Sequence, residues 1–365
     1  MPYPRLELDQ IRVYPLKERY SMTQIEEIVV DPDSPPPPPG DVGEIIKQTA
    51  VLIRSARERG ASVMLTYGAH LLRNGMGPTL IRMMEEGWIT HLATNGAGII
   101  HDWEYSFLGR STESVRENTP KGQFGTWDET GKNINLAAAI GAADDLGFGE
   151  SIGRFIWKDG ATLPLSEELA HAIRNNPWRK RTPALADLLQ LMIRFDLPGG
   201  PYTIQHPWKK YSVPGNAYRL KVPFTVHPGI GYDIISNHPY FSPAAIGRGG
   251  GIDFQTFAAS VTNLSSGVYI SVGSAIMSPQ VFEKAMSCAN NVLLQKGKSV
   301  RDHAILIVDI QDGGGWDWTQ GEPPKTNPAY FLRFCKSFYR MGGHLDYACA
   351  DNRLVVHNLY AALKA

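Results

Sequence analysis

Short apolar runs alternate with longer amphipathic stretches along most of this chain, and each apolar run ends in small or polar residues. The clearest case is residues 90–104, THLATNGAGIIHDWE, in which a strand-like run leads into Asn95-Gly-Ala-Gly98 and then into His101, Asp102 and Glu104. The same plan recurs at 61–66, 222–226, 268–272, 304–310 and 345–349. Apolar runs of this length, bounded by Gly, Asp or Asn, predict six buried strands.

Helical patterns separate most of these runs. Residues 41–60 place apolar side chains at near-helical spacing, Pro78 predicts a helix start, and Ser278-Pro279 predicts a cap and first turn. Further helices are expected at 133–146, 181–195 and 331–339. Alternating strands and helices predict an α/β fold, a Rossmann-like, doubly wound, mostly parallel sheet with helices on both faces. The polar turns would then gather at one edge of the sheet.

Residues 31–40, DPDSPPPPPG, contain five consecutive prolines and predict a stiff polyproline connector. We therefore expect residues 1–40 to form an N-terminal arm and residues 41–365 to form a single catalytic domain. The 365 residues are 43% hydrophobic, with a net charge of zero, which argues against nucleic-acid and membrane-surface partners. Three sparse cysteines, no signal peptide and no long apolar run favour the cytoplasm.

Six small-residue turns at one edge favour a nucleotide cofactor over six unrelated tight loops. The ordinary dinucleotide fingerprint GxGxxG, the P-loop and the GxSxG elbow are absent. His227, Asp233 and His238 match no common zinc spacing, so no metal is expected.

Two features suggest amine chemistry. Trp316-Asp317-Trp318 follows three glycines and would suit a cationic substrate, or would simply anchor its loop by packing. Lys336, in the expected helix 331–339, is either a surface lysine or an amine that forms an imine.

The order of these turns resembles deoxyhypusine synthase and its bacterial homologues, over roughly residues 41–365. The matching segments are TYGAHLLRNG at 66–75, TNGAGIIHD at 94–102, FLG at 107–109, IGRFI at 152–156, VPF at 222–224, GIGYD at 229–233, GIDF at 251–254, GVYISVG at 267–273 and AD at 350–351. Lys336 lies eight residues after Pro328, as the family's reactive lysine lies after a proline.

The resemblance implies NAD as cofactor, a homotetramer, and aminobutyl transfer from a spermidine-like polyamine through a lysine imine to a protein or small-amine acceptor. It implies that the cofactor contacts Gly68, Ala69, Thr94, Asn95, Gly96, Gly273, Ser274, Ala350 and Asp351. We also expect Asp312, which follows the run at 304–310, to contact the cofactor. It implies that Lys336 carries the transferred group and that Asp233 lies in the polyamine pocket. From the residues themselves we add His101 as a proton shuttle, and His227, Trp316, Asp317 and Trp318 as further substrate contacts.

The chain departs from the family on the substrate side. Phe334-Cys335-Lys336 stands where the family has Trp-Gly-Lys, and Ile276-Met-Ser-Pro279 replaces Lys-His-His. Two alternatives therefore stay open: an NAD-dependent oxidoreductase acting on another small amine, and a non-catalytic NAD-binding homologue.

Overall fold

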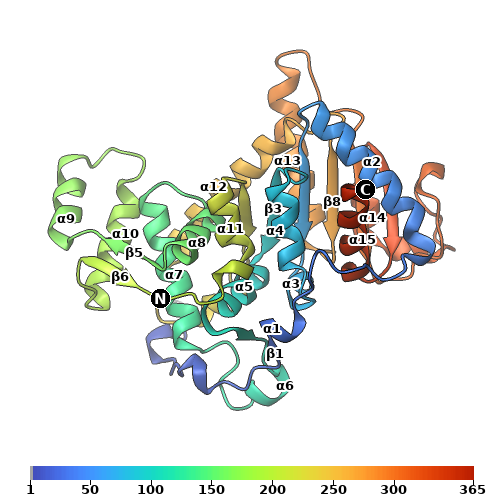
Figure 1. Ribbon diagram of the computed structural model, residues 1–365. Coiled ribbons are helices and arrows are strands. Elements are labelled where there is room, and N and C mark those ends of the chain that lie inside the picture. Colours follow the sequence, from blue (N-terminus) through green and yellow to red (C-terminus); the bar gives the residue numbers. More distant parts are fainter. Residues whose placement is uncertain (1–2) are drawn as a thin grey trace. The chain divides into compact units, whose positions relative to one another are not determined.

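The computed structural model describes residues 3–365, and its main feature is a six-stranded parallel sheet (Figure 1). The strands are β2 (Val63–Tyr67), β3 (His91–Asn95), β7 (Phe224–His227), β8 (Val268–Val272), β9 (Ala304–Asp309) and β10 (His344–Cys349). They lie in the order β7-β3-β2-β8-β9-β10, with every neighbouring pair parallel. This is the Rossmann order 3-2-1-4-5-6, which confirms the predicted fold class.

The central strands are buried on both faces, because helices cover both sides of the sheet. Every residue of β2 and β8 is buried, so the apolar runs are continuous rather than alternating. Helices α2 (Gly43–Glu58), α3 (His70–Arg73), α4 (Gly77–Glu85) and α15 (Asn352–Lys364) form one group, in which α2 contacts β2 and β8, and α15 contacts α2, α4 and β9.

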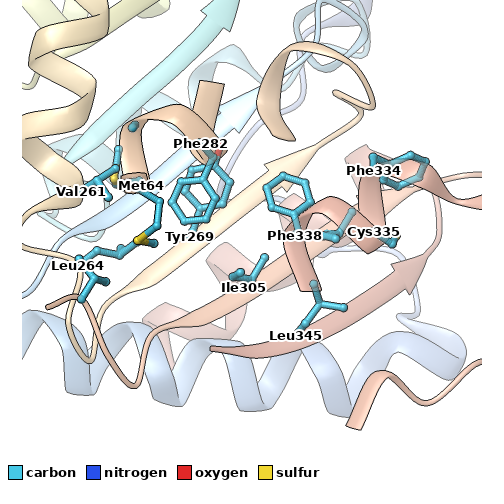
Figure 2. Packing of buried hydrophobic residues seen from close by; sticks show 14 of the residues in the cluster. Met64, Val261, Leu264, Tyr269, Phe282, Ile305, Phe334, Cys335, Phe338 and Leu345 are labelled. Atoms are coloured by element: carbon cyan, nitrogen blue, oxygen red, sulfur yellow. The ribbon is translucent and has the colours of Figure 1, made fainter. Parts of the chain in front are cut away.

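On the other face, the sheet packs against the end of α12 (Pro243–Val261), against α13 (Met277–Leu294) and against α14 (Arg333–Tyr339). Figure 2 shows the aromatic centre of this layer, where the rings of Tyr269 and Phe282 stack at 4.0 Å and Phe338 lies beside them. Cys335 points into the same cluster and is fully buried. Residue 335 of α14 is therefore a core position, whereas the neighbouring Lys336 is half-buried.

The described residues divide into two compact units, where the sequence indicated one domain over 41–365. Unit 2 comprises Ile28–Gly98, Leu220–His227 and Phe254–Ala365 and contains the parallel sheet. Unit 1 comprises the described residues up to Glu27, Ile99–Arg219 and Pro228–Asp253. Because α5 and α12 each run without a break from one unit into the other, no linker marks the division in the sequence.

Unit 1 is mainly helical. Its helices, including those that reach the unit boundary, are α1 (Ile25–Ile28), α5 (Gly96–Leu108), α6 (Val115–Asn118), α7 (Asp128–Ala143), α8 (Phe148–Trp157), α9 (Ser166–Asn175), α10 (Thr182–Arg194), α11 (Val213–Leu220) and the first part of α12, up to Asp253. Its strands pair antiparallel as β1 (Thr23–Gln24) with β4 (Arg110–Ser111), and β5 (Gly160–Leu163) with β6 (Gly200–Thr203). The helices expected at 133–146 and 181–195 are α7 and α10, whose buried faces share one cluster.

Short 3-10 turns complete the structure: Leu8–Gln10, Leu16–Glu18, Gly40–Val42, Lys209–Tyr211, Ile234–Asn237, Trp318–Gln320 and Pro328–Phe331. The expected arm is divided, since the described residues up to Glu27 belong to unit 1 and residues from Ile28 belong to unit 2. The five prolines have no regular secondary structure, and the Pro37 carbonyl accepts a hydrogen bond from Asn358 Nδ2. None of the helices over residues 3–365 is long and apolar enough to cross a membrane.

Candidate cofactor site

Two glycines meet where the strand order reverses, between β2 and β8. The Gly68 N–H donates to the Val272 carbonyl at 3.0 Å, and a Cβ on Gly68 would lie only 2.1 Å from the Gly273 carbonyl oxygen. Gly273 itself has φ +56°, a conformation that favours glycine. Ligands of open α/β sheets bind outside the carboxyl ends of the strands at this reversal point. The close approach of Gly68 and Gly273 therefore defines the centre of the candidate site.

The turn after β3 forms a second wall of this edge. The Asn95 side chain accepts a hydrogen bond from the Gly98 N–H at 2.9 Å and so caps the start of α5, whose first residue is Gly96. Thr94 lies beneath the turn: its buried hydroxyl donates to the Tyr67 carbonyl at 2.9 Å. A Cβ on Gly98 would lie 2.1 Å from that hydroxyl oxygen. Thr94 thus supports the turn, while Asn95 and Gly96 form its edge.

The turn after β8 differs in detail from the expected Ser278-Pro279 cap. Helix α13 begins at Met277, and Ser274 Oγ accepts from the Ser278 N–H at 3.3 Å. The Ser278 hydroxyl is buried and bonds to Tyr269 and Ser271, so it is not available to cap the helix. The N-cap position is Ile276, and Ser274 accepts a bond from one N–H group of the first turn.

Carboxylates follow β9 and β10. Asp312 is exposed and accepts from the Gly314 N–H at 2.7 Å, and Asp351 is exposed and caps α15 through the Arg353 and Leu354 N–H groups. The Ala350 N–H donates to the Asp309 carbonyl at 3.0 Å, which ties the two strand ends together. The predicted cofactor residues of these strands therefore share one edge with Gly68, Asn95 and Gly273.

Sequence reasoning missed two asparagines at this edge. Asn74 Nδ2 donates to Asn352 Oδ1 at 2.8 Å, and Asn352 Nδ2 lies 3.8 Å from where a Cβ on Gly273 would be. This pair joins the segment after β2 to the start of α15. The position of Asn352, directly after the Ala350-Asp351 pair, could have indicated a site residue in the sequence. Its partner Asn74 could not be predicted, because it lies 278 residues away.

Two buried histidines flank the β3–β7 side of the site. His227, the last residue of β7, pairs in register with Asn95, and its Nε2 lies 3.3 Å from Thr225 Oγ1. His91, which the sequence reasoning did not single out, is fully buried and lies 3.0 Å from the same hydroxyl oxygen. Burial lowers the pKa of His227 to about 4, and burial together with His227 lowers the pKa of His91 to about 3.

These pKa shifts predict acid-sensitive stability. The two histidines are neutral in the folded chain, but in the unfolded chain they gain protons below their ordinary pKa of 6.5. Their contribution to the free energy of unfolding is therefore fully present above pH 6.5. It is lost as the pH falls toward 4, because protons bind the unfolded chain more tightly than the folded chain. Between pH 7.5 and 5 the expected loss is about 2 kcal/mol for each histidine. Urea unfolding of wild type and His227→Gln at both pH values measures it, and an equally steep loss in the variant would contradict it.

The two tryptophans after β9 are held by packing and by a hydrogen bond. Trp318 is buried in the core of unit 2, and Trp316 Nε1 donates to the Gly321 carbonyl at 2.9 Å. Asp317 is exposed, and bonds from the Thr319 hydroxyl and N–H and from Gln320 hold its pKa below the usual range. The structure thus favours the loop-anchor interpretation of this segment over a cage for a cation.

Lys336 is half-buried on α14, with Nζ 3.6 Å from the centre of the Tyr330 ring. This cation–π contact holds the end of the side chain against the ring. To form an imine with a substrate carbon, Lys336 Nζ would have to leave the Tyr330 ring.

His101 and Asp233 belong to unit 1, whereas the predicted cofactor residues all belong to unit 2. His101 Nδ1 lies 2.7 Å from Ser111 Oγ, which donates to the buried carboxylate of Glu104. Asp233 is buried and accepts from the Gly229 N–H at 2.7 Å, and burial raises its pKa to about 6. Each side chain is held by partners within its own unit.

The chain matches no protein-family model, and no curated protein matches it. Among solved structures it is similar to unliganded AgrE, with a TM-score of 0.45, 15% identity, and coverage of 88% of this chain and 33% of AgrE. It is also similar to a conserved LOR/SDH protein from Methanococcus maripaludis S2, with a TM-score of 0.44 and 14% identity. That match covers 97% of this chain and 74% of the other. The third structure is ArgZ, an arginine dihydrolase from cyanobacteria, with a TM-score of 0.43 and 12% identity. That match covers 88% of this chain and 31% of ArgZ.

The chain spans about a third of the length of AgrE and of ArgZ. All three likenesses are weak, so the fold assignment rests on the strand order of the sheet itself.

Proposed function

We propose that unit 2 binds NAD at the carboxyl edge of its sheet and that the chain is an NAD-dependent enzyme acting on a small amine. The single observation that carries the cofactor is the meeting of Gly68 and Gly273 at the reversal point of a 3-2-1-4-5-6 sheet. Without side chains at these positions, a pyrophosphate can approach the backbone of both turns closely.

The edge offers different chemistry along its length. Near β2 and β3, backbone N–H groups and the start of α5 at Gly96 suit a phosphate group. Near β9 and β10, the exposed carboxylates of Asp312 and Asp351 suit ribose hydroxyls of the cofactor. NAD would supply the hydride acceptor for oxidation of the carbon beside the substrate nitrogen. The amine substrate is supported by the resemblance to deoxyhypusine synthase.

The test of the cofactor is titration of the full chain with NAD⁺ by calorimetry, followed by incubation with spermidine or putrescine. We expect saturable binding of one NAD per chain. Net formation of NADH on adding amine would identify an oxidoreductase. Transfer of an aminobutyl group without net NADH would identify a transferase, and binding without turnover would identify a non-catalytic homologue. No binding of NAD would overturn the proposal.

Aminobutyl transfer through Lys336 is the finer form of the proposal, and it makes a separate prediction. Borohydride added during incubation with NAD and spermidine should trap an adduct on Lys336, detected by peptide mass spectrometry. Lys336→Arg keeps a cation over Tyr330 and should abolish the adduct while leaving NAD binding unchanged. An adduct that persists in this variant would assign the imine to another lysine.

A further inference from the structure

Four hydrogen-bonding side chains of unit 2 form a continuous line through its interior. Ser260 Oγ lies 2.8 Å from His91 Nδ1, His91 Nε2 lies 3.0 Å from Thr225 Oγ1, and Thr225 Oγ1 lies 3.3 Å from His227 Nε2. His91, Thr225 and His227 are buried, whereas Ser260 is half-exposed. The line therefore begins near solvent and ends at the last residue of β7, beside Asn95 of the candidate site.

The folding of three elements produces this line. Thr225 and His227 lie two residues apart on β7 and so point to the same face of the sheet. His91 begins the neighbouring strand β3, and Phe257 and Ser260 lie three residues apart on α12. The Phe257 ring packs edge to face against both imidazoles, with ring centres 5.3 Å apart in each case. This ring shields the middle of the line from water.

The chemistry of the four groups permits two hydrogen-bond patterns. A neutral imidazole offers one donor and one acceptor nitrogen, and a hydroxyl can donate one bond while accepting another. If Ser260 donates to His91, then His91 donates to Thr225 and Thr225 donates to His227. If His227 donates instead, every bond reverses. Entry of a proton at one end and loss of a proton at the other converts the first pattern into the second.

We infer that Ser260, His91, Thr225 and His227 form a proton wire between solvent and the cofactor edge. The inference rests on the proposed function, in which an alkylammonium substrate and NAD⁺ give an iminium ion, NADH and one proton. The C–H bond breaks with its electron pair leaving as hydride to NAD⁺, the nitrogen loses one proton, and the C=N bond forms. The wire accepts this proton at His227 and releases a proton to solvent at Ser260.

The test is exchange of the imidazole N–H protons with solvent, measured by NMR on full-length protein labelled with ¹⁵N-histidine. In the wild type we expect His91 and His227 to share one exchange rate, because each transfer moves protons at both rings. Thr225→Val keeps the side-chain shape but removes the hydroxyl, and should separate the two rates by at least about tenfold. Thr66→Val is the matched control, since Thr66 is a buried β2 residue whose hydroxyl bonds to Tyr269.

A second variant keeps the inference open to contradiction if Thr225→Val does not fold. Ser260→Ala removes the half-exposed end and should slow both histidines together. Equal rates in Thr225→Val, or unequal rates already in the wild type, would overturn the wire. NAD binding is measured on the same samples: its absence with shared exchange rates would refute the cofactor while leaving the proton path in place.

Discussion

Gly68→Ala should weaken NAD binding by at least about tenfold, equivalent to about 1.4 kcal/mol. The added Cβ would lie 2.1 Å from the Gly273 carbonyl oxygen, a distance that backbone atoms cannot tolerate. The turns after β2 and β8 must therefore separate, and overpacking of this kind costs about 1–3 kcal/mol of stability. Calorimetric titration with NAD⁺ and urea unfolding measure the two effects on one preparation.

Gly251→Ala is the matched control for this substitution. Gly251 lies within α12, and a Cβ there would meet no atom within 4 Å. Alanine is the better helix former, so this variant should be as stable as wild type or slightly more stable, with unchanged NAD affinity. If Gly68→Ala folds normally and binds NAD as tightly as the wild type, the cofactor does not use the Gly68–Gly273 approach.

Glu104→Gln should destabilise the protein by about 3–5 kcal/mol, because it leaves Arg19 charged and buried without its counter-ion. The two side chains form a bidentate pair at 2.7 and 2.8 Å, and both are 1% exposed. Ser111 and Thr130 donate to the same carboxylate and fill its remaining acceptor positions. Chemical denaturation of wild type and variant at neutral pH measures the loss.

The exposed pair Arg340–Glu322 provides a control of the same geometry, since it is also bidentate at 2.6 and 2.8 Å. Glu322→Gln should change stability little, because solvent screens this pair. Removing both buried charges in Arg19→Met with Glu104→Leu should recover part of the loss, since no unpaired charge remains. Equal effects of Glu104→Gln and Glu322→Gln would show that burial does not determine the strength of the pair.

The buried pair of Arg19 and Glu104 also makes the stability of the protein depend on pH. Burial alone would raise the pKa of Glu104, but Arg19, His101 and Ser111 together hold it below its ordinary value of 4.5. A carboxylate with a lowered pKa contributes stability that is present above its unfolded pKa and is lost as the pH falls through its folded pKa. Glu104→Gln should therefore remove stability at pH 7 and flatten the loss below pH 4.5.

The sequence by itself determined the sheet and much of its functional edge. Continuous apolar runs ending in small residues located all six strands to within two residues, because a strand buried on both faces consists mainly of apolar side chains. In a parallel sheet all the strands end at the same edge, so Gly68, Asn95, Gly273 and Asp351 could be grouped before any contact was known.

Only the tertiary structure decided which side chains are already committed to structural contacts. Thr94 supports a turn, Trp318 packs in the core, and the Lys336 ammonium lies on Tyr330. The division into two units was also hidden, because α5 and α12 each continue from one unit into the other without a change in pattern.

The line from Ser260 to His227 and the pair of Arg19 with Glu104 join residues far apart along the chain. Local patterns report burial and periodicity, whereas hydrogen-bond partners and buried charges depend on which distant segments the fold brings into contact.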